Sequence, residues 1–166
     1  MTEKITDIGS RKYLIDDPQM MEMMVDGFFG NIPHASTLGI EFVSIERSKS
    51  CLKIPYKKEL VGNPESGTIH GGVILSIMDS VGGMAVFAAL PAIEAIATLD
   101  LRVDYMKPAA IGKAVYASAE CYKLTNTIAF VRGVAYQNDE NDPVATCAAT
   151  FMRGSSHAVA ITAESK

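Results

Sequence analysis

A histidine, two glycines and an aspartate nine positions after the histidine are the residues best suited to chemistry in this sequence. They are His70, Gly71, Gly72 and Asp79, and the glycine-rich residues 67–72 lead into a long apolar run. The start of a helix presents unpaired backbone N–H groups and the positive end of the helix dipole. A carbonyl oxygen placed there is stabilised as it becomes an oxyanion, and Asp79 is the candidate nucleophile or general base. The pattern favours hydrolysis of an ester or thioester.

The apolar run over residues 73–90 predicts a helix, because it is too long for one strand and ends at Pro91. Its apolar residues lie nearly all the way round, which is typical of a helix wrapped by other structure or lying in a membrane. A membrane span needs about 20 largely apolar residues, whereas this run contains Asp79, two serines and the pair Gly82–Gly83. We therefore expect a buried core helix. Asp79 is then an unusual carboxylate, with either a structural or a catalytic role.

The spacing of His70 and Asp79 predicts a dimer. Nine positions along a helix span about 13 Å at 1.5 Å per residue, so one carbonyl cannot contact both residues of one subunit. Two helices packed antiparallel about a two-fold axis would place each Asp79 near Gly71 of the other subunit. Gly82 and Gly83 favour this obligate homodimer, since each glycine costs a helix about 1 kcal/mol relative to alanine and a usual reason is close approach of another backbone.

The remaining sequence predicts an antiparallel sheet around this helix. Residues 1–17 are expected to form a surface arm, and residues 19–29 an amphipathic helix. Strands are predicted over residues 38–45, 51–56, 93–105, 115–121, 127–136 and 144–152. Short turns between the last four imply antiparallel pairing. We predict an α+β fold in which a curved sheet wraps one long central helix, with an arm and short helix over residues 1–33, one domain over 34–154 and a loose tail over 155–166.

Composition narrows the functional classes. The net charge of −4 argues against a general nucleic-acid binder. Three cysteines without a CxxC motif suggest neither a disulfide framework nor a zinc site, and three histidines far apart make a metal site unexpected. No hydrophobic signal region follows the first residues, so we expect a cytoplasmic protein with no membrane or nucleic-acid partner.

The central segment has three other possible interpretations. A phosphate loop is disfavoured, because residues 67–72 match neither GxGxxG nor GxxxxGK(S/T). Ser76 or Ser80 is a possible nucleophile with His70, but the sequence has no GxSxG elbow and both serines lie in the middle of the helix. His70 has either a direct catalytic role or a structural one as a helix cap, and the sequence leaves both open.

These residues resemble the PaaI-like branch of the hotdog-fold acyl-CoA thioesterases. The resemblance rests on Asn63, on Gly67-x-x-His70-Gly71-Gly72 with Asp79 after it, and on the strand that ends with residues 104–109, DYMKPA. It covers about residues 30–154. It implies a hotdog fold, an acyl-CoA substrate, a homodimer that is often doubled into a homotetramer, and no cofactor apart from the coenzyme A of the substrate.

The resemblance also implies roles for individual residues. Asp79 would act as nucleophile or general base, Gly71 N–H of the other subunit would polarise the carbonyl, Asn63 would orient the water or the carbonyl, and His70 would support the loop. Thr98 would help to place the water, although alternation along residues 93–105 puts it on the solvent face. The candidate substrate-binding residues are Gly72, Tyr105, Lys107, Pro108, Lys123 and Asn126. In the turn that holds the last of these, Thr125-Asn126 replaces the glycine and basic residue that the family often has.

The sequence is also compatible with two other functions. One is a non-catalytic acyl-CoA-binding or regulatory hotdog protein. The other is a hotdog dehydratase, which would need a histidine and an acid acting together on a β-hydroxyacyl chain and fits this arrangement poorly. The acyl group is not determined, because the methionines of residues 20–24 together with Phe28 and Phe29 suit either an aryl or a medium aliphatic pocket.

Overall fold

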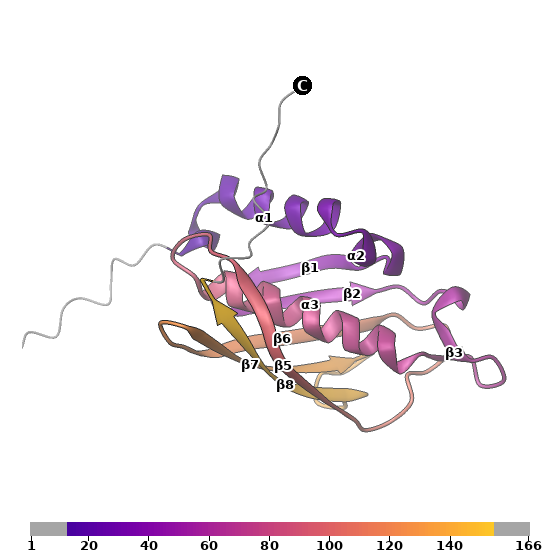
Figure 1. Cartoon of the computed structure of the whole chain (residues 1–166). Coiled ribbons are helices and arrows are strands. Elements are labelled where there is room, and N and C mark those ends of the chain that lie inside the picture. The colour runs from indigo at the N-terminus through magenta and orange to yellow at the C-terminus, as the bar shows by residue number, and fades with distance from the viewer. Residues whose placement is uncertain (1–12, 155–166) are drawn as a thin grey trace, which may run out of the picture.

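A six-stranded antiparallel sheet curves around one long helix (Figure 1). The structure is a computed structural model that describes residues 13–154. Its elements are η2 (Leu14–Asp16), α1 (Pro18–Asn31), α2 (Pro33–Leu38), β1 (Glu41–Glu46), β2 (Lys49–Ile54), η3 (Lys58–Leu60), β3 (Val61–Asn63), β4 (Thr68–Ile69), α3 (Gly71–Ala89), β5 (Ile96–Tyr105), β6 (Val115–Leu124), β7 (Ile128–Tyr136) and β8 (Ala145–Arg153). The sheet order is β1-β2-β6-β7-β8-β5, and β3 and β4 form a separate pair. The predicted α+β arrangement is confirmed. The antiparallel pairing expected between successive members of the last four strands holds for β6, β7 and β8 but is wrong for β5, which pairs with β8 at the edge of the sheet.

Helix α3 forms the centre of the core, as its continuous apolar sequence predicts. It packs against β2, β6 and β7, and its second half is almost completely buried. Fully buried side chains along it include Ile77, Met78, Val81, Met84 and Val86. By length and composition this helix of 19 residues is apolar enough to cross a membrane, but 67% of its most apolar stretch is buried within the described residues. A core helix has these properties.

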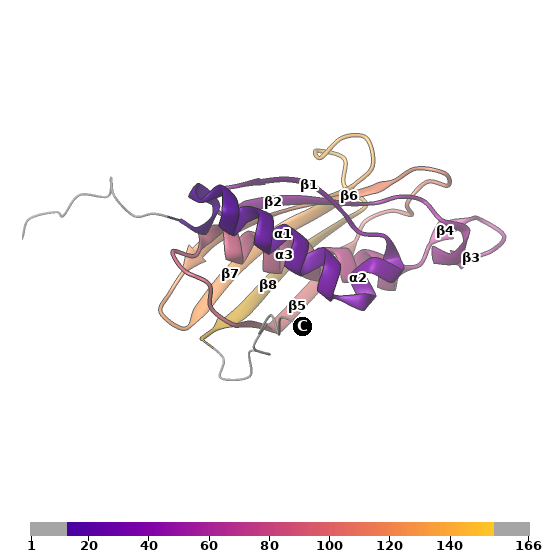
Figure 2. The same cartoon turned by 90° about the horizontal axis from the view of Figure 1, so that it is seen from above.

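The N-terminal region differs in detail from the prediction. The helix expected over residues 19–29 is present as α1, and it runs over α3 when the molecule is seen from above (Figure 2). A second helix, α2, then occupies the start of the strand expected at residue 38. That helix ends at Gly39, which has a left-handed φ of 71°, so β1 begins only at Glu41. The hairpin turn between β1 and β2 is the two residues Arg47 and Ser48, and Ser48 has a left-handed φ of 64°. Of the surface arm predicted over residues 1–17, the described part forms η2, whose Leu14 is buried in the core with 5% of its surface exposed. Residues 1–12 of this arm and the tail over residues 155–166 lie outside the described residues.

Gly82 and Gly83 of α3 face side chains of the same chain. A Cβ atom at Gly82 would lie 3.0 Å from Phe151 Cζ, and one at Gly83 would lie 3.7 Å from Ile96 Cδ1. Phe151 is a core residue of β8 with 2% of its surface exposed. The inference that this glycine pair marks close approach by another subunit is therefore wrong. The glycines make room for a phenylalanine ring in the protomer's own core.

A β-bulge at Leu99 decides which side chains of β5 face the helix. Thr98 pairs with Phe151 and Asp100 with Thr150, so Leu99 is the extra residue on β5. Because facing residues of an antiparallel pair share a face, the alternation along β5 reverses at the bulge. The residues that face α3 are Ile96 and Thr98 before the bulge, and Leu101, Val103 and Tyr105 after it. Strict alternation wrongly places Leu99 in the core, whereas Leu99 is 52% exposed. Thr98 is exposed, as expected, but it lies on the face of the sheet that carries α3 and not on the opposite one.

Candidate active site

His70 lies immediately before the first turn of α3 and caps it. Its Nδ1 accepts a hydrogen bond of 2.9 Å from the Gly72 N–H, which a helix start would otherwise leave unpaired. Two glycines lie close to this exposed histidine: an added Cβ at Gly62 would lie 2.8 Å from His70 Cα, and one at Gly72 would lie 2.9 Å from Nδ1. The geometry therefore supports the capping role. Gly62 is a neighbour that sequence reasoning missed, because only the return of β4 past β3 brings the two together.

Gly71 is the first residue of α3, and its carbonyl forms a hydrogen bond whereas its N–H does not, within the described residues. Its carbonyl accepts a hydrogen bond of 2.8 Å from Tyr105 Oη. Its N–H has no acceptor within residues 13–154, because a first-turn N–H has no helical partner. This N–H is therefore a free donor at the positive end of the helix dipole, as an oxyanion site requires.

Asp79 lies on the exposed stripe of α3 next to strand β5. Its Oδ1 accepts a hydrogen bond of 2.8 Å from Thr98 Oγ1. One turn earlier on the same stripe, Leu75 is 41% exposed. Asp79 itself is half-buried, because β5 ends the sheet and covers only one side of the helix here. The expectation of a carboxylate enclosed by the core is therefore wrong, and Thr98 provides the partner that the sequence did not reveal.

Asp79 and the free N–H of Gly71 belong to the same helix but lie far apart along it. Eight positions correspond to about 12 Å, so these two groups of one protomer cannot contact one carbonyl. The separation inferred from the sequence is confirmed by the extent of α3, Gly71–Ala89.

Asn63 organises the loop that leads to His70. Its Oδ1 accepts hydrogen bonds from the backbone N–H groups of Glu65 (2.9 Å) and Ser66 (3.4 Å), and its carbonyl accepts one from Gly67 N–H (2.8 Å). This is an Asx turn. The side chain is exposed, and its Nδ2 donates no hydrogen bond inside the described part of the chain, so that amide group stays available to a ligand.

The candidate substrate-binding residues fall into two groups at opposite ends of β8. Tyr105 pairs with Ala145, the first residue of β8. Beyond it, Lys107 forms an ion pair with Asp142 and, with Pro108, lines a cavity of about 220 Å³. The exposed Lys123 and Asn126 lie at the β6–β7 turn, beside the last residue of β8. A strand of 9 residues separates the groups by roughly 25 Å at about 3.3 Å per residue, so one protomer does not bring them together.

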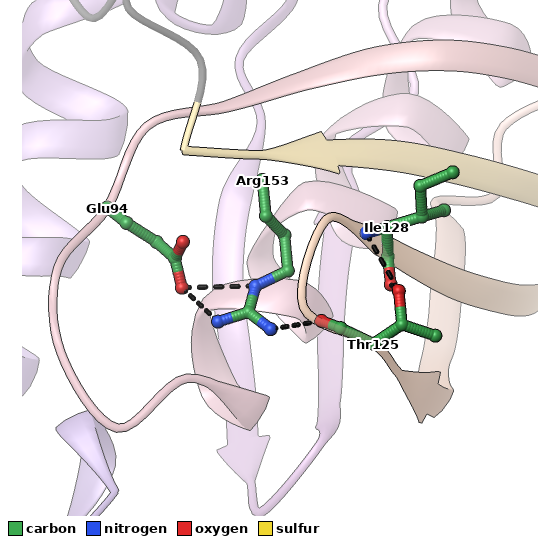
Figure 3. Close-up of polar contacts among 4 residues, drawn as sticks. All are labelled: Glu94, Thr125, Ile128 and Arg153. Carbon is green, nitrogen blue, oxygen red and sulfur yellow. Dashed lines mark hydrogen bonds and ion pairs between the residues drawn. The ribbon is translucent and has the colours of Figure 1, made fainter.

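Arg153 connects three segments at the β6–β7 end of the sheet (Figure 3). Its guanidinium donates to the carboxylate of Glu94, in the loop before β5, and to the carbonyl of Thr125. The Thr125 side chain closes the turn by accepting from the Ile128 N–H at 2.9 Å. Arg153 is only 14% exposed in its side chain and Glu94 26%, so this pair is screened less than a surface ion pair. Sequence reasoning missed it, because 59 positions separate the partners.

Ser76 does not form the pair with His70 that a serine nucleophile would need. Its Oγ donates to the Gly72 carbonyl at 2.9 Å and lies 3.1 Å from Nε2 of His34, which comes from α2. The hydroxyl proton is therefore directed at a backbone carbonyl. This arrangement does not support a serine nucleophile activated by His70.

Cys147 of β8 is a buried thiol near the candidate carboxylate. Its pKa is raised to about 11, mainly by burial; the backbone hydrogen bond from Gly133 lowers the pKa, and the negative charge of Asp79 contributes to raising it. This thiol is neutral near pH 7 and is not a nucleophile. Across residues 13–154, no three His, Cys, Asp or Glu side chains come together in a cluster able to hold a metal ion.

Comparison with known proteins identifies the family. The thioesterase superfamily model matches residues 66–144, which include the β4–α3 junction and Asp79. The chain is 30% identical to the medium/long-chain acyl-CoA thioesterase YigI of Escherichia coli K12 over 149 residues, 82% of this chain and 95% of YigI. This chain belongs to the thioesterase superfamily. The thioester hydrolase predicted from the sequence is therefore confirmed at this level.

Solved structures place this thioesterase among hotdog folds. A crystal structure of a Pseudomonas aeruginosa protein is 41% identical, with a TM-score of 0.71 over 78% of this chain and 96% of the other. The PaaI protein of the phenylacetic acid degradation operon of E. coli is 17% identical, with a TM-score of 0.68 over 76% of this chain and 88% of PaaI. The second match shows the fold alone. The predicted hotdog fold and PaaI-like resemblance are confirmed.

Proposed function

We propose that this thioesterase hydrolyses acyl-CoA thioesters to a carboxylic acid and free coenzyme A, with Asp79 as the catalytic carboxylate and no metal ion. The observation that carries the proposal is the half-exposed Asp79, held at 2.8 Å by Thr98 beside an open strand edge. Thr98 occupies Oδ1, which leaves Oδ2 for the reaction. The similarity to YigI favours an acyl chain of medium or long length.

The chemistry follows from the two groups. A thioester carbonyl that accepts the Gly71 N–H is polarised, and the N–H stabilises the oxyanion that forms on attack. Asp79 either removes a proton from the attacking water or attacks the carbonyl carbon itself. The tetrahedral intermediate then expels the coenzyme A thiolate, which takes up a proton. In the nucleophilic role, expulsion of the thiolate leaves an anhydride between Asp79 and the acyl group, which water then hydrolyses to the carboxylic acid and free Asp79. A single turnover in H₂¹⁸O that places ¹⁸O in the Asp79 side chain would show the nucleophilic role, because water acting with Asp79 as general base places ¹⁸O only in the product acid.

We propose that the two groups meet across a homodimer, with Asp79 of one subunit next to Gly71 of the other. Strand β5 is the last strand of the described sheet, so its outer edge has no strand partner in this part of the chain. It exposes Leu99 at 52%, and such an edge is a natural template for pairing. A dimer in which the two β5 strands pair would bring the two α3 helices side by side. Sedimentation of the purified protein would show whether two such dimers associate into a tetramer.

Free-thiol release from a panel of acyl-CoAs tests the reaction. Asp79→Asn should abolish turnover while leaving the fold and the dimer intact. Glu140→Gln, at an exposed carboxylate of the β7–β8 loop, is the matched control and should retain full turnover. Acyl-CoA binding without turnover in the wild-type protein would instead favour the non-catalytic binding function.

A pair of substitutions at Gly71 tests the N–H donor. Proline lacks an N–H and suits the first position of a helix, and His70 has the extended backbone that a residue before proline needs, with φ −62° and ψ 135°. Gly71→Pro should reduce kcat about 100- to 1,000-fold. Gly71→Ala adds a similar Cβ but keeps the N–H, so it should lose far less. Equal losses in both variants would refute the donor role.

Mixed dimers test the shared site. If each site takes Asp79 from one subunit and Gly71 from the other, a heterodimer of Asp79→Asn and Gly71→Pro chains contains one site with both groups intact. Mixing the two inactive variants under exchange conditions should therefore restore turnover. If all groups of a site came from one subunit, no heterodimer would be active.

A further inference from the structure

Tyr105 contacts the residue that carries the free N–H. Its Oη donates a hydrogen bond of 2.8 Å to the Gly71 carbonyl. Its ring lies against the Gly71 backbone, because a Cβ added there would be 3.4 Å from Cε1, Cζ and Oη of Tyr105. The tyrosine therefore touches the first residue of α3 with both its ring and its hydroxyl.

In the two peptide groups that flank Gly71, every polar atom except the Gly71 N–H forms a hydrogen bond within the described residues. The His70 carbonyl accepts from Val73 N–H at 2.9 Å, and the Gly72 N–H donates to His70 Nδ1 at 2.9 Å. Tyr105 holds the Gly71 carbonyl. Gly71 N–H alone lacks a partner in the part of the chain that the structure describes. The start of α3 restricts the φ and ψ of Gly71, and the hydrogen bonds of His70 and Tyr105 further restrict the direction in which this N–H points.

Tyr105 is itself fixed by the end of β5. It pairs with Ala145 of β8, and the next two residues, Met106 and Lys107, both donate backbone hydrogen bonds to the Val144 carbonyl, at 2.9 and 3.3 Å. The bulge at Leu99 sets the side of the sheet on which Tyr105 emerges. A side chain with such an anchored backbone holds its hydroxyl in a defined place, although it is 52% exposed.

We propose that Tyr105 is a positioning residue that orients the Gly71 N–H toward the thioester carbonyl through its hydrogen bond to the Gly71 carbonyl. This inference rests on the proposed function. It differs from the expectation that Tyr105 binds substrate. A tyrosine that contacts coenzyme A by its ring would act mainly on KM, whereas a tyrosine that directs the oxyanion donor acts on kcat.

Tyr105→Phe tests this directly, because it removes only the hydroxyl. We expect kcat to fall about three- to tenfold, as for the loss of one neutral hydrogen bond, with KM unchanged. Tyr122→Phe is the matched control, since Tyr122 has a similar exposure of 54% and its ring lies beside Phe130 and Arg132 of β7. The control should keep both constants.

A second measurement tests whether Tyr105 affects kcat through the Gly71 N–H. If Tyr105 acts through the Gly71 N–H, adding Tyr105→Phe to Gly71→Pro should cause no further loss of kcat. The amide resonances of Gly71 and Gly72 in ¹⁵N spectra should also shift in Tyr105→Phe, which reports the contact without any turnover.

If the wild-type enzyme is active, two results for Tyr105→Phe would overturn the inference while the proposed function stands. One is a rise in KM with no change in kcat, and the other is no change in either constant. A wild-type protein that releases no thiol from any acyl-CoA would overturn the proposed function itself. The two failures are therefore distinguishable.

Discussion

Thr98 Oγ1 donates a hydrogen bond of 2.8 Å to Asp79 Oδ1, from a strand whose simple alternation would point Thr98 away from the helix. The bulge at Leu99 makes this contact possible, because Thr98 then shares the face of Phe151 on β8. Bulges often re-aim a side chain next to an active site. The contact joins the edge strand to the one carboxylate of the central helix.

Removing the Thr98 hydroxyl should lower kcat. We expect Thr98→Val to reduce kcat about tenfold, because Asp79 loses the hydrogen bond that orients its carboxylate. Thr98→Ser keeps the hydroxyl and should retain most of the activity. Thr150→Val, on the opposite face of the sheet, is the control. Equal activity of Thr98→Val and wild type in the thiol-release assay would show that Thr98 has no part in the reaction.

Adjacent glycines of α3 should respond differently to alanine. At Gly82 the new methyl would meet Phe151 at 3.0 and 3.2 Å, whereas at Gly83 the nearest atom is at 3.7 Å. Gly82→Ala should therefore lower the free energy of unfolding by about 1–3 kcal/mol through overpacking. Gly83→Ala should be neutral or raise it by up to about 1 kcal/mol through better helix propensity.

Urea unfolding measures both glycine variants, with Phe151→Leu added to relieve the contact at Gly82. A smaller effect of Gly82→Ala in the Phe151→Leu background would confirm the coupling. If Gly82→Ala instead dissociated a dimer without loss of stability, the packing argument would be wrong.

Breaking the Glu94–Arg153 pair should destabilise the β6–β7 end of the sheet. Arg153→Met removes the bonds to Glu94 and to the Thr125 carbonyl. We expect a loss of about 1–3 kcal/mol in the free energy of unfolding, because two partly buried acceptors lose their donor. Glu94→Gln should cost less, since Arg153 keeps its bond to Thr125.

The surface pair Arg132–Glu120 is the control for this prediction. Its N–O distance is 2.8 Å, and its side chains are 67% and 34% exposed. Glu120→Gln should change stability by less than about 1 kcal/mol. Similar small effects at both pairs in urea unfolding would show that the Arg153 contacts do not stabilise the fold.

Alkaline pH should destabilise the protein partly through Cys147. Its folded pKa is about 11 against a usual 9.0, mainly because the thiol is buried. The folded state therefore keeps the proton where the unfolded state releases it, and the resulting stability is present below pH 9 and lost as the pH rises toward 11. Cys147→Ala should flatten the fall in the free energy of unfolding over this range, and Cys51→Ala should not. An unchanged slope in Cys147→Ala would contradict the shift.

Several features of this protein follow from local sequence alone. Residues 71–89 form a helix because they are a long apolar run closed by Pro91, and the same run must be buried because apolar residues lie on nearly all sides. The last three alternating segments form the neighbouring antiparallel strands β6, β7 and β8 for equally local reasons, whereas β5 pairs with β8 and not with the strand that follows it. The free N–H at Gly71 also follows, since the first residues of any helix lack internal acceptors.

Other features depended on contacts between residues far apart in the chain. The side of β5 on which Thr98 emerges depended on a bulge that only the register with β8 defines. The role of Gly82 depended on Phe151, the cap at His70 on the space left by Gly62, and the contact of Tyr105 on where β5 ends beside α3. Alternation and helical spacing describe one element at a time, so they predicted most of the elements but not the contacts between them. Which side chains meet was decided by packing between elements, and that depends on tertiary structure.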